Sequence, residues 1–110
     1  GTVADVGTQT VVQWSKRWTS DFRSNINGSG TTPPSTKSLI SNMKKGNVYS
    51  MVIRESGYPA NYEHNILIRN VQKNTRTGKY RYNVMDPNGD RTRAASYWNS
   101  VHKRHLILKP

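Results

Sequence analysis

The sequence predicts an α+β domain in which an N-terminal helix packs on a small antiparallel β-sheet. Apolar residues recur at helical spacing near the start of the chain, whereas alternating and β-branched segments fill its second half. Polar turn signals separate those later segments, and short turns favour antiparallel neighbours. The 110 residues correspond to a single domain, residues 1–110.

The first expected element is a long amphipathic helix over residues 8–24. Thr10 and Gln13 have the spacing of a capping box, in which each side chain satisfies a free backbone N–H at the start of a helix. Basic residues fall off the apolar face, so that face is expected to pack in the core. The apolar stripe comprises Val11, Trp14, Trp18 and Phe22.

Shorter elements follow this helix. A Gly- and Pro-rich loop is expected over residues 25–34, and Ser35 or Thr36 can cap a second helix that ends before Gly46. The turns are expected at residues 73–78 and at the Asp-Pro-Asn-Gly sequence that begins at Asp86. Strands are expected over residues 48–54, 64–71, 80–85 and 106–108, with a short helix over residues 94–102.

The chain is strongly basic, with 17 Lys and Arg against 6 Asp and Glu and a net charge of +11. The excess is spread along both halves, so it does not form a tail. Such a field attracts polyanions, including nucleic acid, acidic cell-wall polymers and anionic membranes. The alternative is a charge that serves solubility alone. No stretch approaches 18 consecutive apolar residues, so no membrane span is expected.

The absence of cysteine excludes several kinds of chemistry for this sequence. A thiolate nucleophile, a disulfide and a Cys-ligated zinc site all need a residue that the chain does not contain. The three histidines have no close carboxylate spacing that would make a ligand pattern. Neither a metal nor a cofactor is therefore expected.

His64 begins one expected strand and Asp86 follows the next. If the turn between the strands centres near Thr75, antiparallel pairing places the two residues opposite each other. A carboxylate beside an imidazole fixes its tautomer and stabilises its charged form, as a catalytic histidine requires. The alternative is a surface histidine at a strand start and an aspartate that serves only the turn.

Residues 35–90 resemble part of a known enzyme family. A helix and a strand precede a loop with Gly-Tyr-Pro at residues 57–59, His64 opens an apolar strand, and the next strand ends in Asp86 and a proline. This order is similar to the C-terminal half of papain-like cysteine peptidases of the bacteriocin-processing type and their secreted actinobacterial relatives. The resemblance implies a papain-like fold, a peptide or protein substrate, and a secreted or extracellular location. It also implies that His64 is the general base and Asp86 its orienting carboxylate.

In that family the nucleophilic cysteine lies at the start of the first long helix. Residues 3–11 resemble the family's Cys-Gly-Pro-Ala-Thr-x-Gln pattern best if Ala4 occupies the cysteine position. The chain would then be an inactivated variant or a degenerate form that binds peptides without cleaving them. The family's upstream oxyanion glutamine has no counterpart, and the capping box at Thr10 starts the helix six residues after Ala4. The start at Gly1 without Met is typical of a processed or recombinant fragment.

A ribonuclease-like toxin or nucleic-acid-binding domain is the main alternative function. His64, His102 and His105 could supply an acid and a base, while Tyr80, Tyr82 and Trp98 could stack bases. The candidate phosphate-binding cations are Arg69, Arg81, Arg91, Arg93, Lys103 and Arg104. A third possibility is a non-enzymatic module that binds acidic wall polymers or a protein partner, although no motif specifies it.

Overall fold

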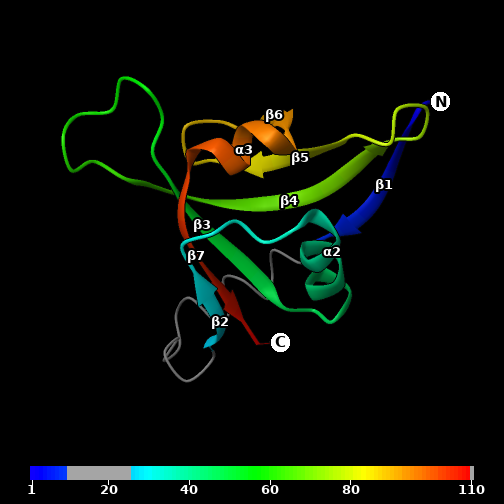
Figure 1. Cartoon of the computed structure of the whole chain (residues 1–110), viewed down its shortest axis with the longest axis horizontal. Helices are drawn as coiled ribbons and strands as arrows, with labels where there is room; N and C mark the ends of the chain where they lie inside the picture. The colour runs from blue at the N-terminus through cyan, green and yellow to red at the C-terminus, as the bar shows by residue number, and fades with distance from the viewer. Residues whose placement is uncertain (10–25, 110) are drawn as a thin grey trace.

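The computed structural model describes residues 1–9 and 26–109. Within these residues, seven strands form one antiparallel sheet in the order β2-β7-β3-β4-β5-β6, and β1 pairs with the second half of β4 (Figure 1). The elements are β1 (Val3–Thr8), β2 (Ile26–Gly30), α2 (Thr36–Lys44), β3 (Val48–Ile53), β4 (His64–Asn74), β5 (Tyr80–Met85), β6 (Arg91–Ala94), α3 (Ala95–Val101) and β7 (His102–Leu108).

The expected papain-like α+β fold, with a long helix packed on a small sheet, is wrong. The sheet dominates the described residues, and the two helices seen there are short, with nine residues in α2 and seven in α3. Thr8, at the start of the expected helix, is the last residue of strand β1. The backbone N–H of Gln9 then donates to the backbone oxygen of Arg69 on β4 at 2.8 Å. The remainder of that helix, including the capping box at Thr10, lies outside the described residues.

The N-terminal residues form a strand because β4 is long enough to pair with two partners on one side. β4 has 11 residues, and its first half pairs with β3 from His64 onwards. Its second half extends beyond β3 and would leave backbone N–H and C=O groups free. β1 pairs with this second half, from Asn70 to Asn74. Local helical spacing in the sequence carries no information about this long-range pairing.

Both helices pack on one face of the sheet, which we call the core face. Leu39 and Met43 of α2 and Trp98 of α3 belong to one buried cluster with the sheet. Trp98 is fully buried, and its indole N–H donates to the backbone oxygen of Tyr82 at 3.2 Å. The strands contribute Tyr49, Met51, Ile53, Ile66, Ile68, Val71, Tyr82 and Val84.

Side chains alternate between the two faces along each strand. A second buried cluster therefore lies on the opposite face, where it comprises Val48, Leu67 and Leu108, with Met85 and Leu106 packed against it. Ser50 and Asn65 also lie on this face, and the Ser50 hydroxyl donates to the Asn65 amide oxygen at 2.9 Å.

Several predictions of local structure are confirmed, and others are wrong. Ser35 caps α2, because its hydroxyl oxygen accepts from the backbone N–H of Ser38 at 3.1 Å. Gly46, just after α2, has a φ of 79°, the left-handed conformation that favours glycine. The expected loop at residues 25–34 instead contains β2, which pairs with β7. β6 was also not expected; it pairs with β5 directly after the predicted turn.

Candidate active site

His64 and Asp86 are in direct contact, as predicted. The imidazole Nε2 lies 2.8 Å from the Asp86 Oδ1 atom. The predicted register is wrong, however, because the ladder pairs Leu67 with Met85, and one further step would bring Asp86 beside Ile66. The Asp86 carboxylate therefore reaches His64 diagonally across the ends of the two strands.

The fold places both side chains on the core face at the edge of the hydrophobic cluster. His64 lies opposite Ile53 in the β3–β4 ladder, so their side chains share a face. Asp86 continues the alternation of the buried residues Tyr82 and Val84 on β5. The side chains of His64 and Asp86 are only 11% and 4% exposed, so water competes weakly for their hydrogen bond.

The carboxylate of Asp86 is also held by the turn that follows it. The backbone N–H of Asn88 donates to Oδ1 at 2.8 Å, and Gly89 closes the turn with a φ of 121°. Burial alone would raise the pKa of Asp86. The hydrogen bonds from Asn88 and His64, together with the positive charge of Arg91, outweigh burial and hold that pKa below its usual value.

Because Nε2 of His64 faces Asp86, Nδ1 is the nitrogen available for proton transfer. This is the reverse of the serine-peptidase arrangement, in which the aspartate holds Nδ1 and Nε2 is the working base. The ring of Tyr62 lies nearly parallel to the imidazole, at a centroid distance of 6.4 Å and an angle of 13°. The pair can therefore act chemically as an oriented general base.

Arg91 and Glu55 extend this pair into a network. Both terminal nitrogens of Arg91 donate to Glu55, at 3.0 and 2.6 Å, and Nη2 also donates to Asp86 Oδ2 at 3.3 Å. The hydrogen bonds from Arg91 are the largest cause of a fall in the pKa of Glu55 to about 2. Glu55 also accepts from the hydroxyls of Tyr58, at 3.0 Å, and Tyr97.

Sequence reasoning did not include Glu55, Tyr58 or Tyr97 in the site. It assigned Arg91 to phosphate binding, whereas the structure pairs this residue with two carboxylates. One signal could have linked Arg91 to Asp86: the Pro-Asn-Gly turn between them reverses the chain, so that Arg91 folds back towards the aspartate. Glu55 lies in a loop that begins after β3, and no local pattern connects it to the site.

The structure does not bring Ala4 to this site. Ala4 lies within β1 and pairs with Lys73, at the far end of β4 from His64. The nine positions between His64 and Lys73 correspond to roughly 30 Å along an extended strand. The prediction that Ala4 occupies the nucleophile position is therefore wrong, because the N-terminal segment pairs in the sheet instead of starting a helix beside the histidine.

The six candidate phosphate-binding cations do not gather on one surface. Arg93 packs over the ring of Tyr97 on the side of α3, at 4.9 Å from the centroid, whereas Arg69, Arg81 and Arg104 alternate onto the opposite face. Arg69 and Arg104 pair with carboxylates, Arg81 donates to Gln72, and Lys103 is exposed on β7. Arg91 belongs to the Asp86 network.

The other two histidines form a buried pair of their own, and strand β3 separates His102 from His64. His102 Nε2 and His105 Nδ1 are 2.8 Å apart, and burial lowers the pKa of each residue. Tyr82 and Trp98 are buried in the core, so they offer no free ring face to a nucleic-acid base. The structure therefore does not bring these residues together with His64 as a ribonuclease-like site.

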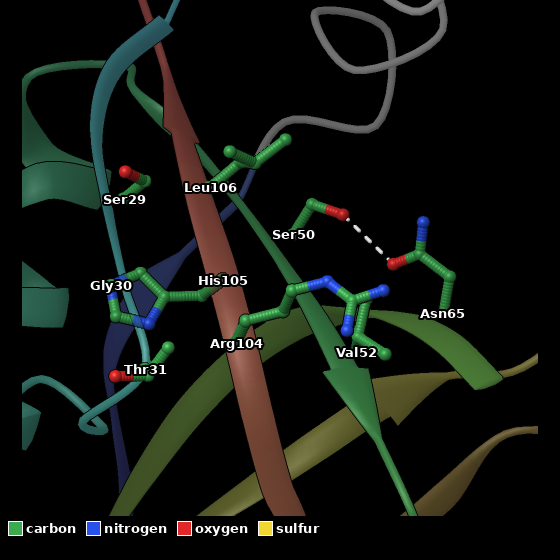
Figure 2. Close-up of a pocket in the computed structure, with 9 residues that line it drawn as sticks. All are labelled: Ser29, Gly30, Thr31, Ser50, Val52, Asn65, Arg104, His105 and Leu106. Carbon is green, nitrogen blue, oxygen red and sulfur yellow. Dashed lines mark hydrogen bonds between the residues drawn. The ribbon is translucent and has the colours of Figure 1, made fainter. Parts of the chain in front are cut away.

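Several hollows lie on the described part of the chain, and one of about 380 Å³ is lined by Glu55, Tyr58, Asp86 and Arg91 of the network above. Two others lie along the sheet. Figure 2 shows the first, of about 300 Å³, in which Arg104 extends over Val52 towards Asn65 while His105 points towards Gly30 and Thr31. The second hollow, of about 490 Å³, is lined mainly by side chains of the face opposite to His64, and it meets the site only at Asp86. Its apolar lining includes Leu67, Met85 and Pro87, and its rim carries the Arg69–Asp90 ion pair.

Among the described residues, no three or more His, Cys, Asp or Glu side chains are grouped so that they could hold a metal ion. No helix in the same part of the chain has the length and apolar character needed to cross a membrane. Comparisons with protein-family models, curated proteins and solved structures found no match to this chain. The argument for function therefore depends on the site itself.

Proposed function

We propose that the chain carries the histidine–aspartate half of a cysteine-peptidase type of site and that, without a cysteine, it binds peptides and does not cleave them. The observation that carries this proposal is the contact of 2.8 Å between His64 Nε2 and the nearly buried Asp86 carboxylate. The carboxylate is itself fixed by a turn N–H and an arginine, so the imidazole faces a carboxylate of defined orientation. The order of residues around the pair resembles the peptidase family described above.

The hollow beside Asp86 supports the peptide-binding part of the proposal. Leu67, Met85 and Pro87 give it an apolar lining that suits an apolar side chain of a peptide. The exposed Arg69–Asp90 pair on its rim offers a donor and an acceptor to a peptide backbone. No nucleophile is assigned in this chain, because Ala4 lies far from the base and cysteine is absent.

The reactivity of the base can be tested with p-nitrophenyl acetate, an activated ester that imidazole nitrogens attack. We expect His64→Gln to remove most of the catalysed hydrolysis and Asp86→Asn to reduce it about tenfold or more, because the imidazole loses its orienting partner. Asp5→Asn is the matched control, since Asp5 is exposed on β1 and accepts hydrogen bonds from Asn70 and Gln72, away from His64. Equal rates for the wild type and Asp86→Asn would rule out an oriented base.

Peptide binding can be tested by titrating isotopically labelled protein with a pool of unstructured peptides from digested casein. We expect NMR shifts to concentrate at Asn65, Leu67 and Met85, and Met85→Glu to weaken them because it places a charge in the apolar hollow. Thr77→Glu adds the same charge in the exposed turn after β4 and should have no effect. Absence of any localised shift at millimolar peptide would reject a peptide-binding function.

A further inference from the structure

We infer that the face of the sheet opposite to the core face carries a site for the free C-terminal carboxylate of a peptide, formed by Arg104 and Asn65 beside the apolar hollow. This inference rests on the proposed function in taking a peptide as the ligand. It adds the kind of peptide that is bound, which is one that ends in an apolar residue with a free carboxylate.

Three residues on neighbouring strands lie in one row at this site. Val52 of β3 pairs with Asn65 of β4 on one side and with Arg104 of β7 on the other, so the three side chains share a face. The Arg104 side chain extends over Val52 towards Asn65 (Figure 2). All three residues line the hollow of about 300 Å³, so the guanidinium group and the carboxamide face the same space above an apolar floor.

Asn65 presents its NH2 group to this hollow because its amide oxygen is already occupied. The hydroxyl of Ser50, a residue that is only 4% exposed, donates to Asn65 Oδ1 at 2.9 Å. This hydrogen bond orients the carboxamide so that Nδ2 lies on the side away from Ser50 (Figure 2). Asn65 is exposed, and within residues 1–9 and 26–109 its Nδ2 atom has no hydrogen-bond partner.

Arg104 also has unused hydrogen-bond donors. Its Nη1 atom donates to Glu63 Oε2 at 2.8 Å, whereas Nε and Nη2 bind none of the described residues. A guanidinium group has five N–H bonds, and Arg91 of this protein already binds two carboxylates, those of Glu55 and Asp86. Arg104 can therefore keep its contact with Glu63 and bind a second carboxylate.

The free groups of Arg104 and Asn65 are all donors, so the ligand that suits them is an acceptor with negative charge. None of the described residues that line the hollow of about 300 Å³ is acidic. A carboxylate accepts at both oxygens and forms stronger hydrogen bonds than a neutral carbonyl group does. A C-terminal amide would instead place an NH2 group against these donors.

The neighbouring apolar hollow indicates which residue carries that carboxylate. Asn65 lines both hollows, and Leu67 follows it on the same face of β4, about 7 Å further along the strand. One terminal residue can therefore place its carboxylate at Asn65 and its apolar side chain against Leu67 and Met85. A phosphate group of RNA has the negative charge but no apolar group to fill the second hollow, so these residues favour a peptide.

The test compares an acetylated tetrapeptide of glycine, serine, glycine and leucine as the free acid and as the C-terminal amide. Each is titrated into the isotopically labelled full chain at about 150 mM salt, where attraction between distant charges is largely screened. The free acid should bind about tenfold more tightly than the amide, because hydrogen bonds to a charged acceptor contribute more. NMR shifts should concentrate at the Asn65 side-chain NH2 group and at the side chains of Leu67 and Met85.

Two variants test the residues that bind the carboxylate. Arg104→Gln should remove most of the preference for the free acid. Asn65→Asp keeps an oxygen that accepts from Ser50 but replaces the NH2 group with a charged oxygen, so it should abolish the preference. Arg81→Gln is the matched control, because Arg81 is exposed on the same face and donates to Gln72 at the other end of β4.

Equal affinity of the wild type for the free acid and the amide would overturn the inference, and this comparison needs no variant to fold. A preference that survives in both variants, or that falls equally in Arg81→Gln, would also overturn it. A second free acid, in which serine replaces the terminal leucine, should bind more weakly. Equal binding of the two acids would overturn the assignment of an apolar terminal residue.

The outcomes for the carboxylate site and for the proposed function can be separated. Localised binding of the acid and the amide with equal affinity would overturn the carboxylate site and leave the proposed function intact. The same conclusion follows if neither tetrapeptide binds while the casein peptides give localised shifts. An absence of localised shifts with every peptide would reject both proposals.

Discussion

His102 and His105 share one hydrogen bond at 2.8 Å inside the protein. Nδ1 of His102 is buried and has no partner among the described residues. Adding a proton to either imidazole would require hydrogen on both ring nitrogens of one of them, and the shared bond can accommodate only one hydrogen. Protonation would therefore break this bond or leave a buried N–H without an acceptor, and both outcomes cost free energy.

This pair predicts a loss of stability in mild acid. Burial lowers the pKa of both histidines below the ordinary value of 6.5, so the unfolded chain takes up protons before the folded protein does. The free energy of unfolding should be highest above pH 6.5 and fall as the pH drops from 6.5 towards 5. Urea unfolding at pH 7.5, 6 and 5 measures this change.

A variant with both histidines replaced by phenylalanine should lose less stability over the same range, whereas His64→Gln should retain the fall seen in the wild type. An unchanged pH dependence in the double variant would contradict the assignment.

Glu55 affects stability at lower pH. Its pKa falls from 4.5 to about 2 on folding, so its contribution to the unfolding free energy is present above pH 4.5 and is lost as the pH falls towards 2.

At the scale of elements, the side chain of Gln9, just after β1, forms hydrogen bonds with the backbone of β3. Its amide nitrogen donates to the backbone oxygen of Tyr49 at 3.0 Å, and its amide oxygen accepts from the Tyr49 N–H at 2.9 Å. Gln9 is 5% exposed, so the side chain replaces the backbone of a neighbouring strand at a buried position.

Gln9→Ala should therefore destabilise the protein more than an ordinary surface substitution. The change leaves both backbone groups of Tyr49 without their partner, which we expect to cost about 2–4 kcal/mol of unfolding free energy. Gln72→Ala is a matched control, because Gln72 makes its bonds to Asp5 and Arg81 at the exposed surface. Urea unfolding at pH 7.5 measures the unfolding free energy of both variants. Equal losses would show that the hydrogen bonds to Tyr49 contribute no more stability than those of the exposed Gln72.

The elements also show which patterns can be recognised in the sequence. The Ser35 cap, the alternation of Tyr80, Tyr82 and Val84, and the turn after Asp86 depend on neighbouring residues, so they were predictable. β1, β2 and β6 are edge or peripheral strands whose partners lie far away or beyond a turn. Their sequences lack strong alternation, so only pairing with a longer strand makes them strands.

At the scale of the whole molecule, the net charge is +11, and the basic side chains of the described residues are dispersed over both faces of the sheet. Several of the candidate phosphate-binding arginines are paired with carboxylates or amides. A dispersed charge attracts polyanions without the aligned contacts that a binding groove provides.

We therefore expect weak adsorption to RNA that depends steeply on salt. Fluorescence anisotropy with a labelled single-stranded RNA should detect binding at low ionic strength and lose most of it by about 200 mM salt. Arg91→Met should change this binding no more than Arg93→Met, because Arg91 is neutralised by Glu55 and Asp86. Tight binding that persists at 200 mM salt would instead favour the nucleic-acid-binding alternative.

The sequence by itself determined the contact between His64 and Asp86, the helix after Ser35 and the absence of a thiol nucleophile. Each depends on residue identity, a short-range pattern or one hairpin, and a hairpin is closed by its own turn. Only the tertiary structure decided that Ala4 pairs with Lys73, that Gln9 serves Tyr49, and that Glu55 balances Arg91. Those contacts join residues 36 to 69 positions apart in the sequence. Local periodicity cannot predict them, because it does not show which distant strand pairs with an edge or which buried charges pair with each other.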